Sequence, residues 1–200
     1  MVALHTYGPT LLGATLSGHS IYPGAPDLTA TQRQASLQMG MPLVWGHEFD
    51  ASHAAAAEMG HEASGRTALY AAFLAGVPAV YCETAWGLGG EAEYARGLSR
   101  LLVHLGMVAG ENAPLEPREF IESTAHQAWL MSSHNQTPVA GLWTPARAVW
   151  DHVAEGDLLG MVCDLYGKPA HEMRAQQDGV VISVPRVQYM EEGTHGGLVL

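Results

Sequence analysis

The stretch from Pro78 to Val108 constrains the fold of this chain more than any other. Pro78–Cys82 (PAVYC) is apolar throughout, which is typical of a strand buried in a parallel sheet. Glu83 and a glycine-rich turn follow, and a helix is expected from about Glu91 to Val108. Its apolar side chains recur at helical spacing: Ala95, Leu98, Leu101, Leu102 and Leu105. A buried strand that leads directly into such a helix predicts an α/β unit.

The residues before Pro78 continue this alternation of strands and helices. Four more elements are expected: a strand at Val2–Leu4, a helix from Leu28 to about Met39 with Asp27 as its cap and Gly40 as its stop, a strand at Pro42–Trp45, and a helix from Ser64 to Ala75. The polar segment between His5 and Pro26 is expected to be a loop, because glycine and proline interrupt it.

The alternation of strands and helices ends near Ala109. The segment AGENAPLEPRE has two prolines and several charges, and it reads as a linker between Gly110 and Glu119. Short apolar segments broken by Gly, Pro and Asp follow it, which favours a small antiparallel barrel or sandwich. The sequence therefore predicts an α/β domain over residues 1–112 and a β domain over residues 119–200.

Composition narrows the class of protein. Apolar residues make up 48% of the chain and charged residues 14%, as in globular proteins. A net charge of −11 repels phosphate backbones, so nucleic acid is not an expected partner. No apolar run approaches the ~20 residues that span a bilayer, so no membrane association is expected. Cys82 and Cys163 do not make a disulfide framework, and the start MVALHTYGPT does not resemble a signal peptide, so a cytoplasmic location is predicted.

Two side chains that can do chemistry follow predicted strands. His5 comes after Val2–Leu4, and Glu83 comes after Pro78–Cys82. Functional groups of open α/β sheets gather at the carboxyl ends of strands, where a histidine and a glutamate suit a metal ligand and a general base. The alternative is a terminal histidine and a loop carboxylate without a role.

Three sets of residues resemble one known family when they are taken in order. Val2–Thr6 resembles its D-L-H-T/S-G segment, and Pro78–Glu83 with the glycines after it resembles its G-x-P-A-x-x-x-E-x-G-G-x-G segment. The C-terminal series resembles its barrel-sandwich domain: Gly141–Trp143, Glu155–Asp157, Leu159–Gly160, Asp164–Gly167 and Asp178–Val181. This is the pattern of the succinylglutamate desuccinylase/aspartoacylase family of zinc-dependent deacylases.

The resemblance implies a fold and a reaction. The fold is a partial zinc-carboxypeptidase-like mixed or parallel sheet with helices, followed by a small C-terminal β barrel-sandwich domain. The reaction is hydrolysis of the amide bond of an N-acyl amino acid, such as succinylglutamate, acetylaspartate or an acetyldiaminobutyrate-like amide. His5 would be a zinc ligand and Glu83 the catalytic acid/base. From their own chemistry, Arg66, Gly89 and Gly90 are the expected substrate-binding residues: Arg66 would pair with a substrate carboxylate, and the glycines would let the backbone turn sharply beside Glu83. The alternatives are a solvated arginine and an ordinary strand-to-helix loop.

The sequence also departs from the family pattern. The family has its first two zinc ligands in a G-x-H-G-x-E segment well before the third, whereas this sequence begins almost at His5. Ala3 replaces the aspartate of D-L-H. One imidazole does not hold zinc against water. We therefore expect an N-terminally truncated member that is inactive alone. The alternatives are a non-catalytic fragment or an interaction subunit, and an exposed sheet edge makes a homo-oligomer possible.

Two alternative hypotheses for the function rest on other residues. His47 and Asp50 have H-x-x-D spacing with His53 nearby, which would suit another metallohydrolase, although a surface loop is expected here. A carrier domain would need a lysine at a hairpin tip, where this sequence has Arg174, while Lys168 lies in a different turn.

Overall fold

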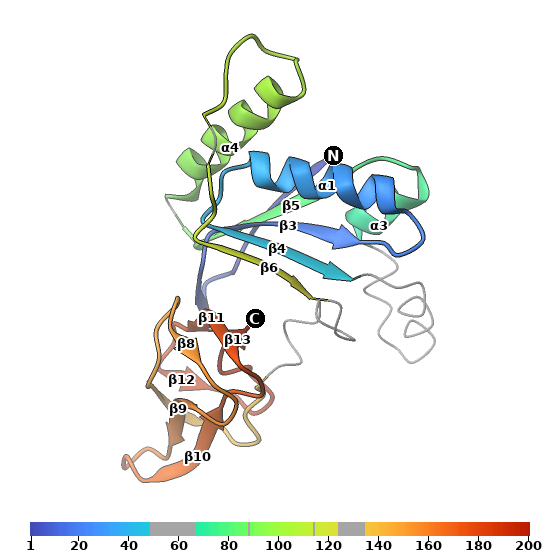
Figure 1. Cartoon of the computed structure of the whole chain (residues 1–200). Helices are drawn as coiled ribbons and strands as arrows, with labels where there is room; N and C mark the ends of the chain where they lie inside the picture. Colours follow the sequence, from blue (N-terminus) through green and yellow to red (C-terminus); the bar gives the residue numbers. More distant parts are fainter. Residues whose placement is uncertain (49–66, 88, 114, 124–134) are drawn as a thin grey trace. The chain divides into compact units, whose positions relative to one another are not determined.

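The computed structural model describes residues 1–48, 67–87, 89–113, 115–123 and 135–200. The chain divides into two compact units (Figure 1). The α/β unit comprises Met1–Thr6, Thr15–Thr84 and Leu88–Trp129, and the β unit comprises Tyr7–Ala14, Ala85–Gly87 and Leu130–Leu200. No helix of the described residues is both long and apolar enough to cross a membrane.

The α/β unit is built on a five-stranded sheet with helices. Its elements are β1 (Val2–Thr6), β3 (Leu16–Ile21), α1 (Pro26–Gln38), β4 (Leu43–Glu48), α3 (Ala68–Leu74), β5 (Val80–Thr84), α4 (Gly90–His104) and β6 (Glu119–Ser123). The strand order is β1-β5-β3-β4-β6. Only β5 and β3 pair antiparallel; the other neighbours are parallel. The predicted mixed sheet with helices is therefore confirmed. Strands β1 and β5 run in one direction and β3, β4 and β6 in the other, so the carboxyl ends of the two groups lie at opposite ends of the sheet.

The central strand β3 was wrongly predicted to be a loop. Its sequence, LSGHSI, is polar, yet every residue but the last is buried. Helix α1 makes this possible, because it satisfies polar groups of the strand: Ser17 Oγ donates to Ser36 O at 2.8 Å, and Gln32 Nε2 donates to Ser20 O at 2.9 Å. Buried polar groups need such partners, and a single sequence does not reveal them.

The helix boundaries differ from the expected ones in small ways. Helix α1 begins at Pro26, before the predicted cap Asp27, and Gly40 follows it at φ +65°, as expected of a stop signal. Helix α3 begins at Ala68, where the Thr67 side chain accepts from Tyr70 N; Ser64 lies outside the described residues. Helix α4 ends at His104 rather than at Val108.

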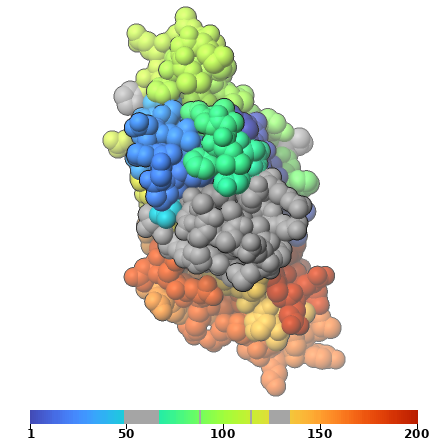
Figure 2. All heavy atoms as spheres, turned by 90° about the vertical axis from the view of Figure 1, so that its right-hand side faces the viewer, coloured from blue at the N-terminus to red at the C-terminus, as the bar shows by residue number. Residues whose placement is uncertain are grey.

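The helices α1 and α4 pack on one face of the sheet. Their shared core contains Met39, Met41, Cys82 and Leu101. Burial, and to a lesser degree the neighbouring Glu83 carboxylate, raises the pKa of the Cys82 thiol to about 12, so this thiol stays neutral. Helix α3 lies beside the segment that joins β3 to α1, where Tyr22 stacks on Phe73 with ring centroids 3.9 Å apart (Figure 2, blue and green).

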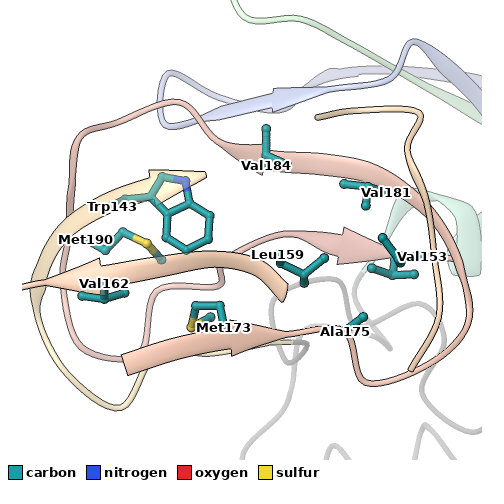
Figure 3. Close-up of a cluster of buried hydrophobic side chains, with 10 residues drawn as sticks. Trp143, Val153, Leu159, Val162, Met173, Ala175, Val181, Val184 and Met190 are labelled. Carbon is teal, nitrogen blue, oxygen red and sulfur yellow. The ribbon is translucent and has the colours of Figure 1, made fainter. Parts of the chain in front are cut away.

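The β unit consists of antiparallel sheets, as the turn-rich C-terminal sequence predicted. Its strands are β2 (Leu11–Gly13), β7 (Gly141–Pro145), β8 (His152–Val153), β9 (Leu158–Cys163), β10 (Pro169–Arg174), β11 (Gly179–Pro185), β12 (Tyr189–Met190) and β13 (Leu198–Val199). One sheet has the order β10-β9-β7-β12; the other is β13-β11-β2, with β8 also paired to β11. Buried side chains between them include Trp143, Leu159, Val162, Met173 and Met190 (Figure 3).

The two compact units are interleaved along the chain. After β1 the chain contributes β2 to the β unit, where Ser183 of β11 pairs with Gly13, and then returns for β3. Strand β6 begins at Glu119 and pairs with β4, so it belongs to the sheet of the α/β unit. Division of the protein into domains 1–112 and 119–200 stays a prediction. The compact units differ from it in three places, because Tyr7–Ala14 and Ala85–Gly87 belong to the β unit and β6 belongs to the α/β unit.

Candidate active site

His5 and Glu83 lie opposite each other on neighbouring strands. The register of the parallel pair β1–β5 matches His5 with Glu83, so both side chains point to the same face of the sheet, on strands about 4.8 Å apart. Cys82, the next residue of β5, points to the other face, which α1 and α4 cover. The structure thus brings together the two residues that the sequence singled out. His5 is exposed, and Glu83 is 8% exposed.

Burial changes the proton affinity of Glu83. Removing the carboxylate from water raises its pKa from 4.5 to about 7. One carboxyl oxygen, Oε2, is buried and has no hydrogen-bond partner among the described residues. On the β3 side the register places Leu16 next to Glu83, and the side chain of Leu16 offers no polar group. A carboxyl group with a pKa near 7 can both accept and donate a proton at neutral pH, which is what general acid–base catalysis requires.

An aromatic cluster lies farther along the same face of the sheet. The Trp45 and Tyr81 rings meet edge to face at a centroid distance of 6.4 Å, and His47 lies 5.8 Å from Tyr81 and 5.1 Å from Trp45. His47 is a buried residue of β4, so its assignment to a surface loop was wrong. Asp50 and His53 lie outside the described residues.

His47 does not belong with His5 and Glu83. Leu16 pairs with Glu83 on one side and with Leu43 on the other, so Glu83 and Leu43 lie at the same position along the strand direction. His47 is four residues beyond Leu43, or about 13 Å along the strand. The physical reason is the antiparallel pairing of β3 and β5, which places the carboxyl ends of β4 and β5 at opposite edges.

Gly18 makes room for the aromatic cluster, because it pairs with both Tyr81 and Trp45. A Cβ atom here would lie 2.1 Å from Tyr81 Cζ. We expect Gly18→Ala to lower the free energy of unfolding by about 1–3 kcal/mol, since the buried ring has to move. Urea unfolding measures this. Gly24→Ala is the matched control, because a Cβ there meets no atom within 4 Å. Equal stability of the two variants would contradict the assigned packing.

Helix α4 anchors the ends of both strands behind the site. The Tyr94 hydroxyl donates to the carbonyl oxygen of His5 and lies 3.1 Å from Thr84 Oγ1, which donates to it. Gly90, the first residue of α4, has no side chain where a Cβ would lie 2.2 Å from Thr84 Oγ1. Sequence reasoning missed Tyr94, because nothing in its helical position signals a contact with β1.

The other three predicted site residues are Gly89, Gly90 and Arg66. Gly89 has φ +128°, and its N–H donates to Glu91 Oε2 at 2.8 Å, so it shapes the turn into α4. A substrate-binding role for Gly89 and Gly90 stays a prediction. Arg66 lies outside the described residues.

A metal centre is not complete within the described residues. They contain no group of three or more His, Cys, Asp or Glu side chains that could hold a metal ion. Catalytic zinc needs three protein ligands and an open position, whereas β1 and β5 together offer one imidazole and one carboxylate. The described residues therefore do not fit zinc by themselves.

A second polar cluster, on the helix-covered face, also escaped sequence reasoning. Glu122 of β6 accepts from His19 Nε2 at 2.9 Å and from Arg33 Nε at 2.6 Å. Burial lowers the pKa of His19, which favours the neutral ring. Burial raises the pKa of Glu122, but the hydrogen bonds from Arg33 and His19 outweigh this effect and lower it. Because His19 is fully buried, the cluster joins α1, β3 and β6 rather than meeting a ligand.

Comparison with known proteins identifies the fold. No family model matches the chain. The structure of the ectoine utilization protein EutE (DoeB) from Ruegeria pomeroyi superposes with a TM-score of 0.78 at 23% identity, over 99% of this chain and 58% of that one. A succinylglutamate desuccinylase/aspartoacylase from Rhodobacter sphaeroides gives a TM-score of 0.76 at 19% identity, over 99% and 56%. The chain has the fold of the succinylglutamate desuccinylase/aspartoacylase family.

A sequence match agrees with this fold and confirms the resemblance inferred from the motifs. The chain is 33% identical over 89 residues to the N-alpha-acetyl-L-2,4-diaminobutyric acid deacetylase of Halomonas elongata, which is 43% of this chain and 25% of that protein. The chain thus spans somewhat more than half the length of the solved family structures and a quarter of this curated relative.

Proposed function

We propose that this chain contributes the proton-transferring half of a deacylase that hydrolyses the amide bond of an N-acyl amino acid. One observation carries the proposal: a buried carboxyl group, Glu83, with a pKa of about 7 lies directly across from His5 on one face of the sheet. The motif resemblance and the match to a diaminobutyric acid deacetylase support this substrate class.

Glu83 would act in both halves of the reaction. Its carboxylate takes a proton from a water molecule as the oxygen attacks the amide carbonyl. The same carboxyl group then gives that proton to the amide nitrogen, the C–N bond breaks, and a carboxylate and an amine leave. A pKa near 7 suits this double role, because both protonation states are populated at neutral pH. Tyr94 holds the backbone of His5 in place beside Glu83.

Zinc is the cofactor that the family resemblance implies. Bound zinc would polarise the carbonyl group of the substrate amide and would lower the pKa of the attacking water molecule. His5 is the described residue suited to contribute a ligand, and further ligands would have to come from another segment or another chain. For that reason, the 200 residues alone are expected to have little activity.

A chimera tests this function. The part of the Ruegeria protein that this chain does not cover is joined to the 200 residues, and hydrolysis of N-α-acetyl-diaminobutyrate, N-succinylglutamate and N-acetylaspartate is measured with zinc present. We expect turnover of at least one substrate, and Glu83→Gln should lower kcat about 10²–10⁴-fold. Glu111→Gln is the matched control on an exposed residue and should change nothing.

Two results would contradict the proposal. Full activity of the Glu83→Gln chimera would remove Glu83 from the reaction. A folded, zinc-loaded chimera that hydrolyses none of the three amides would favour the alternative, a non-catalytic fragment or interaction subunit.

A further inference from the structure

The end of strand β1 that carries His5 has few packing contacts of its own. The side chains of Leu4, His5 and Thr6 are all exposed, and the strand partner that the structure describes for β1 is β5. A strand end without buried apolar contacts opens easily. The position of the His5 side chain opposite Glu83 therefore depends on the hydrogen bonds that hold the main chain of β1.

A chain of two side-chain hydrogen bonds reaches this strand end from helix α4. Thr84 Oγ1 donates to the Tyr94 hydroxyl at 3.1 Å, and the Tyr94 hydroxyl donates to the carbonyl oxygen of His5. Both donors are firmly placed. Thr84 is 1% exposed, and the Tyr94 ring packs against the core that contains Cys82 and Leu101. The hydrogen bonds thus join a packed helix to an exposed strand end.

Gly90 leaves space for the first hydroxyl group of this chain. A Cβ atom at Gly90 would lie 2.2 Å from Thr84 Oγ1 and 3.0 Å from Thr84 Cβ, so an alanine there would push the hydroxyl group away from Tyr94. Helix α4 itself does not need this glycine, because glycine has a lower helix propensity than alanine. The space for Thr84 Oγ1 gives Gly90 a structural role beside the site.

We propose that Tyr94 is a positioning residue: its hydroxyl group, oriented by Thr84, fixes the main chain of His5 and so sets the distance between the side chains of His5 and Glu83. Gly90 contributes by leaving room for the Thr84 hydroxyl group, a role that requires no substrate. The placement of the two side chains is a property of this chain alone, whereas its value for catalysis rests on the proposed function.

Nuclear Overhauser effects in the 200-residue chain test the placement directly. Neighbouring strands lie about 4.8 Å apart, so a cross-peak between the Cβ protons of His5 and Glu83 is expected. Tyr94→Phe should weaken this cross-peak about twofold or more, because the strand end is released. Ala3 and Tyr81 form another pair on the same face of the same two strands, and their cross-peak should stay unchanged.

Further variants interrupt the hydrogen bonds at other points. Thr84→Val and Gly90→Ala should both weaken the cross-peak between His5 and Glu83, but less than Tyr94→Phe, because Tyr94 can still donate. Adding Thr84→Val to Tyr94→Phe should have no further effect, since both changes act through one hydrogen bond. Thr84→Ser keeps the hydroxyl group and should match the parent chain.

Ser99→Ala is the matched control for the loss of a hydroxyl group from α4. Ser99 Oγ donates to Ala95 O within the helix, so this variant should leave the cross-peak between His5 and Glu83 unchanged.

The kinetics of the chimera separate positioning from substrate binding. Tyr94→Phe should lower kcat about tenfold or more and leave KM unchanged, because a displaced side chain slows the reaction while the hydroxyl group contacts the strand and not the substrate. Gly90→Ala should change kcat in the same direction. A raised KM with unchanged kcat in both variants would contradict the positioning role.

Three results of the cross-peak experiment would overturn the inference. These are an unchanged cross-peak between His5 and Glu83 in Tyr94→Phe, an equal loss for the pair Ala3 and Tyr81, and equal effects of Thr84→Ser and Thr84→Val. The cross-peaks require neither substrate nor metal. If they respond as expected in the chain while the chimera is inactive, the proposed function fails and the positioning role stands. Unchanged cross-peaks together with an active chimera would reject the positioning role alone.

Discussion

Replacing Glu83 by glutamine is expected to raise the free energy of unfolding by about 3 kcal/mol at pH 8. The folded structure holds the pKa of this carboxyl group at about 7, against 4.5 in an exposed state, and one pKa unit corresponds to about 1.4 kcal/mol. At pH 8 the parent protein has to bury a charge at this position, whereas glutamine is neutral at every pH. A residue kept at such a cost to stability is typical of an active site.

The sign of the effect follows from proton binding. Between pH 4.5 and about 7, the folded state keeps the Glu83 proton and the unfolded state loses it. The contribution of Glu83 to stability is therefore complete below pH 4.5 and is lost as the pH rises toward 7. The lowered pKa of His19 acts in the other direction, removing stability as the pH falls below 6.5, but it is common to both proteins and cancels in their difference.

Urea unfolding of the parent chain, Glu83→Gln and Glu111→Gln at pH 4.5, 6 and 8 measures this prediction. The difference between the parent and Glu83→Gln should grow with pH, and Glu111→Gln should follow the parent at every pH. Parallel curves for Glu83→Gln and the parent would mean that Glu83 titrates as an exposed carboxylate, and the argument for an acid/base would lose its physical basis.

Replacing Trp143 by alanine is expected to cost about 3–5 kcal/mol, because the indole fills the centre of the β unit. The ring is 6% exposed and packs in the same core as Leu159, Val162 and Met190 (Figure 3). Its far edge lies over Gly160 of β9, where a Cβ atom would be 2.2 Å from Cη2 of the ring. The two positions therefore share one volume, and their substitutions should not be additive.

A double-mutant cycle measures this coupling. Gly160→Ala alone should lower the free energy of unfolding by about 1–3 kcal/mol, because it overpacks the ring. In the Trp143→Ala background the same methyl group enters vacated space, so the cost should vanish or become a gain. Urea unfolding of the four proteins gives the values. Additive effects would show that Gly160 and the indole do not compete for space.

The site divides into a part that sequence patterns predicted and a part that they missed. His5 and Glu83 could be found because each ends an apolar run, and parallel strands bring such ends together. Tyr94 and the cluster of His19, Arg33 and Glu122 could not be found. The hydrogen bonds of these residues join positions that are between 10 and 103 residues apart in the sequence. Patterns of apolar and polar residues within one element do not predict such pairs.

By itself, the sequence determined the local elements and the family pattern: the strand that carries Glu83, the helix after the glycine turn, the stop at Gly40 and the antiparallel structure of the C-terminal part. Apolar runs, helical spacing and glycine conformation act over a few residues, so they can be read directly. Only the tertiary structure decided that the polar strand β3 lies in the centre of the sheet, antiparallel to β5, and that His47 therefore lies far from Glu83. It also decided the pKa of Glu83, because burial depends on what the rest of the chain places around a side chain.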